Sequence, residues 1–202
     1  SLPDAPMLFF MAWGVYFASR IVVYGYPVDY AVSGFFIGLS ASTKYNGGLA
    51  GLIVPLAAFL RWAAVKMKLT DFREDFPYFK TILNILLAGM CAVFSFVLGT
   101  PYSVLDYETF SRTDGPQGAF WQFKNVGAVP FYEHLGKFYS DVSFKISDDL
   151  GYTMLVALFL SCGLVFVRFL KRTFSKYDLS LLFLIIPTFV LIYYISGFEK
   201  SR

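Results

Sequence analysis

GLSASTKYNGG, residues 38–48, is a polar stretch that separates two apolar runs. Lys44 within it is the only charged residue between Asp29 and Arg61. A charged side chain inside a membrane segment costs about 3 kcal/mol on insertion scales, so it normally faces a partner, a cavity or the interface. Lys44 is therefore a candidate site residue. The alternative is that its ammonium simply reaches the interface from a hairpin turn between two short helices.

The composition is that of an integral membrane protein. Of the 202 residues, 57% are hydrophobic and 20% are aromatic, and the mean hydropathy is +0.59. Soluble domains contain only about 45–50% apolar residues. The net charge is +3, and membrane topology explains where the basic residues fall, so we expect membrane lipids and no nucleic acid as partners.

Apolar runs predict an all-α, polytopic transmembrane bundle that forms a single domain over residues 1–202. Each run approaches the roughly 20 residues that cross a bilayer, although the second and third are shorter. Because the chain begins and ends beside apolar runs, we expect it to be an internal part of a longer protein. The predicted crossings are about residues 5–24, 30–44, 48–62, 81–99, 151–170 and 179–197, and a long extracytoplasmic loop covers about 100–150.

Basic residues gather in alternate links of this predicted bundle, at residues 61–80 and 171–176. Short loops rich in Lys and Arg stay in the cytoplasm. With six crossings, Asp4, Lys44 and the long loop then share the outer face. We therefore expect a functional site on that face.

Two groups near the start of the chain suit a phosphate at the membrane boundary. Lys44 offers a cation, Tyr45 and Asn46 offer hydrogen bonds, and Gly47-Gly48 let a ligand approach the backbone closely. Asp4 lies at the N-terminus of the first predicted helix, where the helix dipole favours a carboxylate. Capping of that helix alone would also explain Asp4.

The outer loop holds further candidates. Tyr102 follows the proline that ends the fourth run, and Asp106 and Glu108 could contact an acceptor or a metal. The alternative for these residues is an interfacial aromatic belt followed by a solvated helix. His134 is the only histidine, and a lone histidine beside aromatic residues is more typical of packing than of a base.

Three segments follow one another in an order that is typical of one enzyme class. They are LPDAPMLFF at residues 2–10, residues 29–48, and GTPY at residues 99–102, which opens the outer loop. In these segments the chain resembles the middle of polytopic GT-C glycosyltransferases, the bacterial relatives of protein O-mannosyltransferases and aminoarabinose transferases (glycosyltransferase families 39 and 83).

The resemblance implies transfer of a sugar from a polyprenyl-phosphate donor to an acceptor hydroxyl of a lipid, glycan or protein. The reaction would occur on the outer, periplasmic face of a bacterial inner membrane. Lys44 matches the family lysine in the Thr-Lys segment, with Tyr45 and Asn46 beside it, and we expect it to neutralise the leaving phosphate. Asp4 matches a family acidic position near the donor phosphate, or near a divalent metal where one is bound.

The same resemblance places the catalytic general base in the first outer loop, ahead of Ser1. No catalytic residue is therefore expected within this chain, which should bind donor without turning it over. Tyr102, Asp106 and His134 would contact the acceptor or the loop.

Two other functions remain open from the sequence. In a transporter or flippase core, Lys44 would be an intramembrane substrate contact, but transporters often carry two matching broken helices, and the second half of this chain shows no counterpart. A membrane scaffold whose outer loop binds a partner is the third alternative.

Overall fold

The computed structural model describes residues 4–68, 77–115, 118–119, 136, 146–171 and 175–185. Regular secondary structure within these residues is helical, with no strand, which confirms the predicted all-α class. The chain divides into two compact units. One comprises Ser1–Ser111 with Phe174–Leu184, and the other comprises Arg112–Thr173 with Ile185–Arg202.

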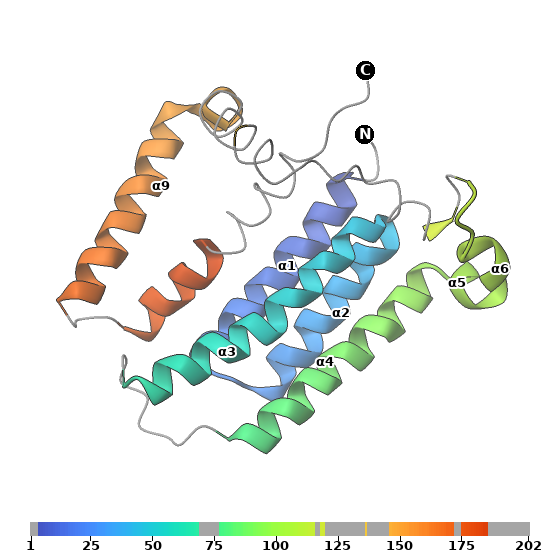
Figure 1. Cartoon of the computed structure of the whole chain (residues 1–202), viewed down its shortest axis with the longest axis horizontal. Helices are drawn as coiled ribbons and strands as arrows, with labels where there is room; N and C mark the ends of the chain where they lie inside the picture. The colour runs from blue at the N-terminus through green and yellow to red at the C-terminus, as the bar shows by residue number, and fades with distance from the viewer. Residues whose placement is uncertain are drawn as a thin grey trace. The chain divides into compact units, whose positions relative to one another are not determined.

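The first unit is a bundle in which α2 contacts α1 along one side and α4 along another (Figure 1). A 3₁₀ helix follows α2 and runs directly into α3, so that these segments form a hairpin. Two short helices, α5 and α6, continue from the end of α4. The bounds are α1 Asp4–Val23, α2 Pro27–Thr43, η1 Tyr45–Leu52, α3 Ile53–Lys66, α4 Tyr78–Gly99, α5 Tyr102–Leu105 and α6 Tyr107–Phe110.

The turn between α1 and α2 is fixed by a glycine and a proline. Gly25 has φ +67, a left-handed conformation that favours glycine, and Pro27 occupies the first turn of α2. Arg61 of α3 then closes the end of α1, because its Nη1 donates to the carbonyls of Val22 (3.2 Å) and Val23 (2.8 Å). These bonds satisfy carbonyls that the helix end leaves without partners.

Close approach of α2 to α4 depends on small residues. A Cβ atom at Gly34 would overlap the backbone of Ala88, and one at Gly38 would overlap the hydroxyl of Ser95. Ser95 Oγ also donates to the carbonyl of Phe35 at 2.7 Å. Small residues four apart with interhelical hydrogen bonds are a common way for membrane helices to associate.

Within the described residues, three segments are long and apolar enough to cross a membrane: Ala5–Val23, Gly47–Lys66 and Tyr78–Gly99. The sequence predicted the third crossing at residues 48–62. In the structure η1 and α3 join into one longer segment that includes Arg61 and ends at Lys66. By contrast, α2 has 17 residues. The prediction of a helical membrane protein therefore stands, while its count of six crossings stays a prediction.

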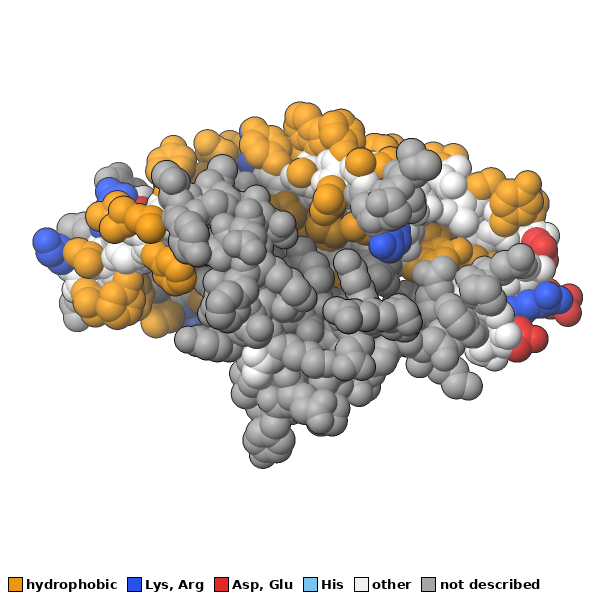
Figure 2. Space-filling model, turned by 90° about the horizontal axis from the view of Figure 1, so that it is seen from above, with side chains coloured by type: hydrophobic (Ala, Val, Ile, Leu, Met, Phe, Trp, Pro, Cys, Tyr) orange, Lys and Arg blue, Asp and Glu red, His pale blue; other side chains and the backbone are white. Residues whose placement is uncertain are grey.

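Hydrophobic side chains cover much of the described surface, as expected for helices that face lipid (Figure 2). On α4, Ile82, Leu86 and Phe94 are all more than half exposed. In the second unit, α9 spans Ile146–Leu170 and its apolar part covers Phe159–Leu170. The last predicted crossing, 179–197, begins within a helix at residues 176–185, and its remainder lies outside the described residues.

Candidate functional site

The chain leaves the helical conformation at Lys44. Its backbone is extended, with φ −157 and ψ 125, between the end of α2 and the start of η1. The Lys44 N–H still donates to the carbonyl of Ser40 (3.2 Å), and the Lys44 carbonyl accepts from the N–H of Gly47 (2.8 Å). The backbone on both sides of the lysine is thus tied down, which fixes the point from which its ammonium extends.

Hydroxyl groups around Lys44 bond to backbone carbonyls and join three helix ends. Ser40 Oγ donates to the carbonyl of Met7 in α1 at 3.0 Å, and Thr43 Oγ1 donates to the carbonyl of Ser40 at 2.8 Å. Thr100 Oγ1, just after α4, donates to the carbonyl of Ser42 at 3.4 Å. These hydroxyls position the break, by which we mean the non-helical backbone at Lys44 between α2 and η1. The sequence did not predict that role. Several Ser and Thr residues in the last turn of an apolar helix are the signal that could have revealed it.

The Ser40–Met7 hydrogen bond also sets the register between α1 and α2. Asp4 lies three residues before Met7, and Lys44 lies four residues after Ser40. At a rise of about 1.5 Å per residue, the two backbones lie about 4.5 and 6 Å beyond this bond, at the same end of the bundle. The side chains of Asp4 and Asn46 lie outside the described part of the structure.

Tyr45 belongs to an aromatic cluster that holds the segment after α4 against this end. Its ring centroid lies 6.5 Å from that of Phe96 in α4 and 5.8 Å from that of Phe110 in α6. Phe96 and Phe110 are 6.1 Å apart. Among 24 phenylalanines, nothing in the sequence singles these two out, so only the structure reveals them.

The loop candidates occupy different environments. Tyr102, at the start of α5, is 70% exposed. Asp106 caps α6, because its side chain accepts a hydrogen bond from the N–H of Thr109 at 3.2 Å. His134 lies outside the described residues. Across the residues that the structure describes, no three His, Cys, Asp or Glu side chains gather as metal ligands.

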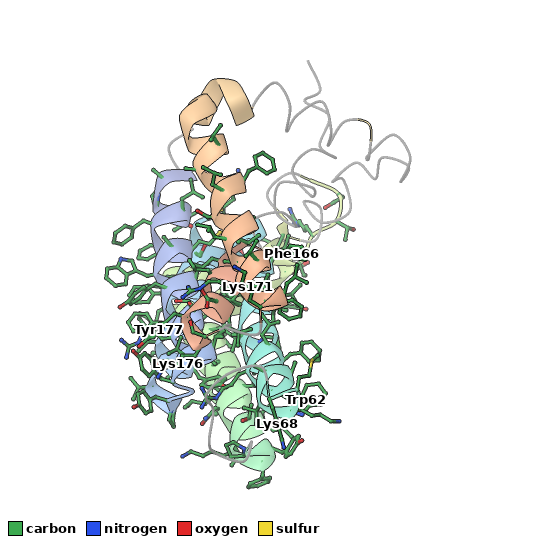
Figure 3. All side chains as sticks on the ribbon, turned by 90° about the vertical axis from the view of Figure 1, so that its left-hand side faces the viewer. Trp62, Lys68, Phe166, Lys171, Lys176 and Tyr177 are labelled. Atoms are coloured by element: carbon green, nitrogen blue, oxygen red, sulfur yellow. The ribbon has the colours of Figure 1, made fainter. Side chains whose placement is uncertain are left out.

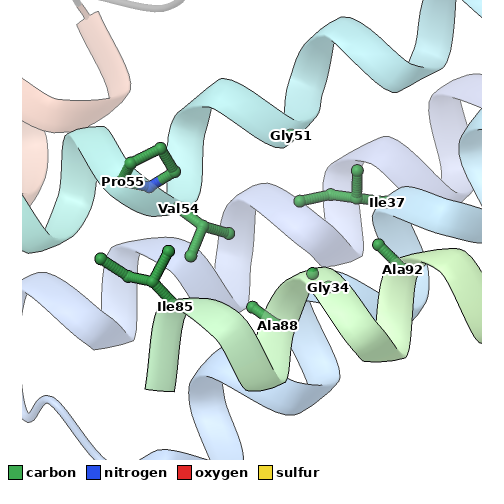
Figure 4. A pocket seen from close by; sticks show the side chains of 9 residues that line it. Gly34, Ile37, Gly51, Val54, Pro55, Ile85, Ala88 and Ala92 are labelled. Atoms are coloured by element: carbon green, nitrogen blue, oxygen red, sulfur yellow. The ribbon is translucent and has the colours of Figure 1, made fainter. Parts of the chain in front are cut away.

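An apolar hollow of about 220 Å³ opens between α2, the η1–α3 segment and α4 (Figure 4). Gly89 faces open space there, because no described atom lies within 4 Å of the position of its Cβ atom. Ile37, which lines the hollow, precedes Lys44 by seven residues on α2, about 10 Å along the helix. The lining residues are Gly34, Ile37, Gly51, Val54, Pro55, Ile85, Ala88, Gly89 and Ala92.

Comparison of the chain with models of protein families, with curated proteins and with solved structures gives no match.

Proposed function

We propose that this chain forms part of a GT-C-like membrane glycosyltransferase that uses a polyprenyl-phosphate sugar as donor. The sugar passes to a hydroxyl of a lipid, glycan or protein on the outer face of a bacterial plasma membrane. One observation carries the proposal. The same helical hairpin places a cationic break at the end of the bundle and an apolar hollow about two helical turns away.

A polyprenyl-phosphate donor has an anionic head at the membrane boundary and a long apolar tail. A lysine ammonium binds phosphate as a point charge, and it stabilises the charge that develops on a leaving phosphate. The tail would enter the hollow, which is smaller than the roughly 300–1,000 Å³ of typical small-molecule pockets. The hollow would therefore hold a section of the tail.

The remaining candidates have supporting roles in this proposal. Tyr45 and Asn46 border the phosphate, and Asp4 lies at the same end of the bundle. Tyr102 and Asp106 line the approach of the acceptor. Donor binding is the activity that we assign to these residues.

The first experiment measures the affinity of the purified chain, in detergent, for a polyprenyl monophosphate. A hydrogen bond to a charged group contributes about 1.5–3 kcal/mol, so Lys44→Ala should weaken binding by about tenfold to a hundredfold. Lys80→Ala is the matched control, because Lys80 is exposed in the first turn of α4, at the other end of the bundle. Equal affinities of the two variants would refute the role of Lys44.

A second variant tests the tail. Gly89 lines the hollow and is exposed, so Gly89→Leu adds a side chain at the rim of the hollow without a clash in the described structure. We expect it to weaken binding of the long-chain phosphate and to leave binding of a short-chain analogue unchanged. Gly163→Leu in α9 is the control, since its Cβ position is equally open. If both leucines have the same effect, the tail does not use the hollow.

A transporter is the second candidate, because an eight-residue 3₁₀ helix interrupts the hairpin immediately after Lys44, and broken helices carry substrate sites in many transporters. The two functions separate in liposomes that contain the protein in its full natural length. Sugar transfer from radiolabelled donors, lost in Lys44→Ala, supports the glycosyltransferase. Flux of a ligand across the bilayer without transfer supports the transporter.

A further inference from the structure

Two basic side chains meet around one tyrosine ring at the end of the bundle opposite Lys44. Arg20 Cζ lies 5.5 Å from the ring centroid of Tyr24, and Lys176 Nζ lies 5.8 Å from the same centroid. Lys176 and Tyr177 begin the helix at residues 176–185 and lie beside α1 (Figure 3). Residues far apart in the sequence thus bring two positive charges to one ring within the same compact unit.

Arg20 and Lys176 both keep N–H donors that an anion can accept. Arg20 Nε donates to Asp29 Oδ1 at 2.7 Å, and the guanidinium also interacts with the Tyr16 side chain. Because a guanidinium carries five N–H groups, donors remain for a further acceptor. The Arg20 side chain is 37% exposed, whereas that of Asp29 is 2% exposed. Among the described carboxylates, none forms an ion pair with Lys176. Both positive charges lie near the Tyr24 ring, so an anion bound beside that ring is attracted by both.

The position of this pair along α1 matches the level of lipid headgroups. The apolar span of α1 ends at Val23, and Tyr24 is the next residue. Tyr24 and Tyr26 stack with their centroids 5.7 Å apart, and both are exposed, as is Tyr177. Exposed tyrosines beside Lys and Arg form the aromatic belt of a membrane–water interface. About 22 Å of helix, the rise from Asp29 to Lys44, separates this end from the break.

We propose that Arg20 and Lys176 bind the phosphate of an anionic phospholipid at this end of the bundle. The guanidinium fork of Arg20 suits two phosphate oxygens, and Lys176 neutralises the same group from the other helix. The acyl chains lie along the exposed aromatic face of α1, where Phe9 and Trp13 are 58% and 42% exposed. Basic clusters between membrane helices are known to select anionic headgroups in this way.

The choice of an anionic lipid follows from charge. A zwitterionic headgroup carries its own ammonium, which offsets the phosphate and repels the two protein cations. A net negative headgroup such as phosphatidylglycerol has no such group. The site is independent of the proposed sugar transfer, since it uses neither Lys44 nor the hollow.

The test is a titration of the purified full chain in detergent, followed by native mass spectrometry. The ligands are phosphatidylglycerol, phosphatidylcholine with the same acyl chains, and inorganic phosphate. We expect phosphatidylglycerol to bind most tightly, and Lys176→Gln to weaken its first binding step about fivefold, the effect of one basic residue near an anionic surface. Lys66→Gln should leave that step unchanged. Lys66 is the matched control, because its Nζ lies 5.1 Å from the Trp62 ring and is the only described cation placed over it.

A second variant keeps the proposal testable if Lys176→Gln does not fold. Arg20→Lys keeps a positive charge beside Asp29 and removes only the fork, so it should weaken phosphatidylglycerol binding while circular dichroism stays unchanged. Three results would overturn the proposal. These are equal affinity for the two lipids, equal losses of phosphatidylglycerol affinity in Lys176→Gln and Lys66→Gln, and binding of inorganic phosphate as tight as that of phosphatidylglycerol. The third result would mean that the site binds an adventitious ion only.

Discussion

Replacement of Gly47 by alanine should separate the two arms of the hairpin that carries Lys44. A Cβ atom at Gly47 would lie 2.5 Å from Ser40 Oγ and 2.6 Å from the Ser40 carbonyl oxygen, whereas ordinary contacts begin near 3.4 Å. Either η1 moves away from α2 by most of an ångström, or the Ser40 hydroxyl leaves the carbonyl of Met7. Overpacking of this kind typically costs about 1–3 kcal/mol.

The neighbouring glycine provides the control. A Cβ atom at Gly48 would meet only the Cβ of Ala41, at an ordinary 3.6 Å, and neither glycine has a positive φ. Alanine at Gly48 should therefore be neutral, or stabilise η1 by up to about 1 kcal/mol.

Thermal unfolding of the purified protein, followed by circular dichroism, measures both variants. For a chain of this size 1 kcal/mol corresponds to roughly 2–4 °C, so Gly47→Ala should lower Tm by roughly 2–12 °C while Gly48→Ala does not lower it. If the two variants unfold at the same temperature, or if Gly48→Ala is the less stable one, the close contact between Gly47 and Ser40 is not what holds the break.

Two further predictions concern the turn between α1 and α2 and the N-terminal cap of α6. Gly25→Ala should lower the free energy of unfolding by more than about 1 kcal/mol. A left-handed residue with a side chain costs roughly that much, and the new Cβ would also lie 2.9 Å from Arg61 Nε. The control is Gly89→Ala, which has open space around it and should not lower the free energy of unfolding in the same denaturation experiment. Asp106→Ala should speed amide hydrogen exchange at Thr109 by roughly fivefold, since a helix cap typically contributes about 1 kcal/mol. Asp106→Asn keeps the cap, so its exchange rate should equal that of the parent protein. Identical exchange in both variants would mean that the cap hydrogen bond at 3.2 Å contributes nothing.

Hydropathy predicted α1 and α4 closely but ended the third helix too early. The run at residues 81–99 corresponds to α4, and the run at residues 5–24 corresponds to α1, within a few residues. The third run was placed at residues 48–62 because Arg61 looked like the start of a polar link. In the structure Arg61 stays within α3 and bonds to the end of α1, a tertiary contact that no local pattern encodes.

For the candidate site, the sequence identified the charged residue but not its supports. Lys44 stands out because it is alone between two apolar runs. The hydroxyl of Ser40 and the ring of Phe110 hold that end of the bundle through partners 33 and 65 residues away in the chain. Serine and phenylalanine are common in membrane helices of any function, so their identity alone says nothing about such long-range contacts.

The burial of α2 explains how this chain can hold a charge beside so short a helix. At 17 residues α2 is only about 26 Å long, less than the roughly 30 Å of a hydrocarbon core. Its polar residues face other helices. Ser33 and Ser40 are fully buried, and their hydroxyls donate to the carbonyls of Gly14 and Met7 in α1. Because α1, α4 and η1 all contact α2, the segment that ends at Lys44 meets protein along much of its length. The irregular backbone at Lys44 therefore follows a helix supported by protein, which is the setting in which a membrane segment tolerates non-helical backbone.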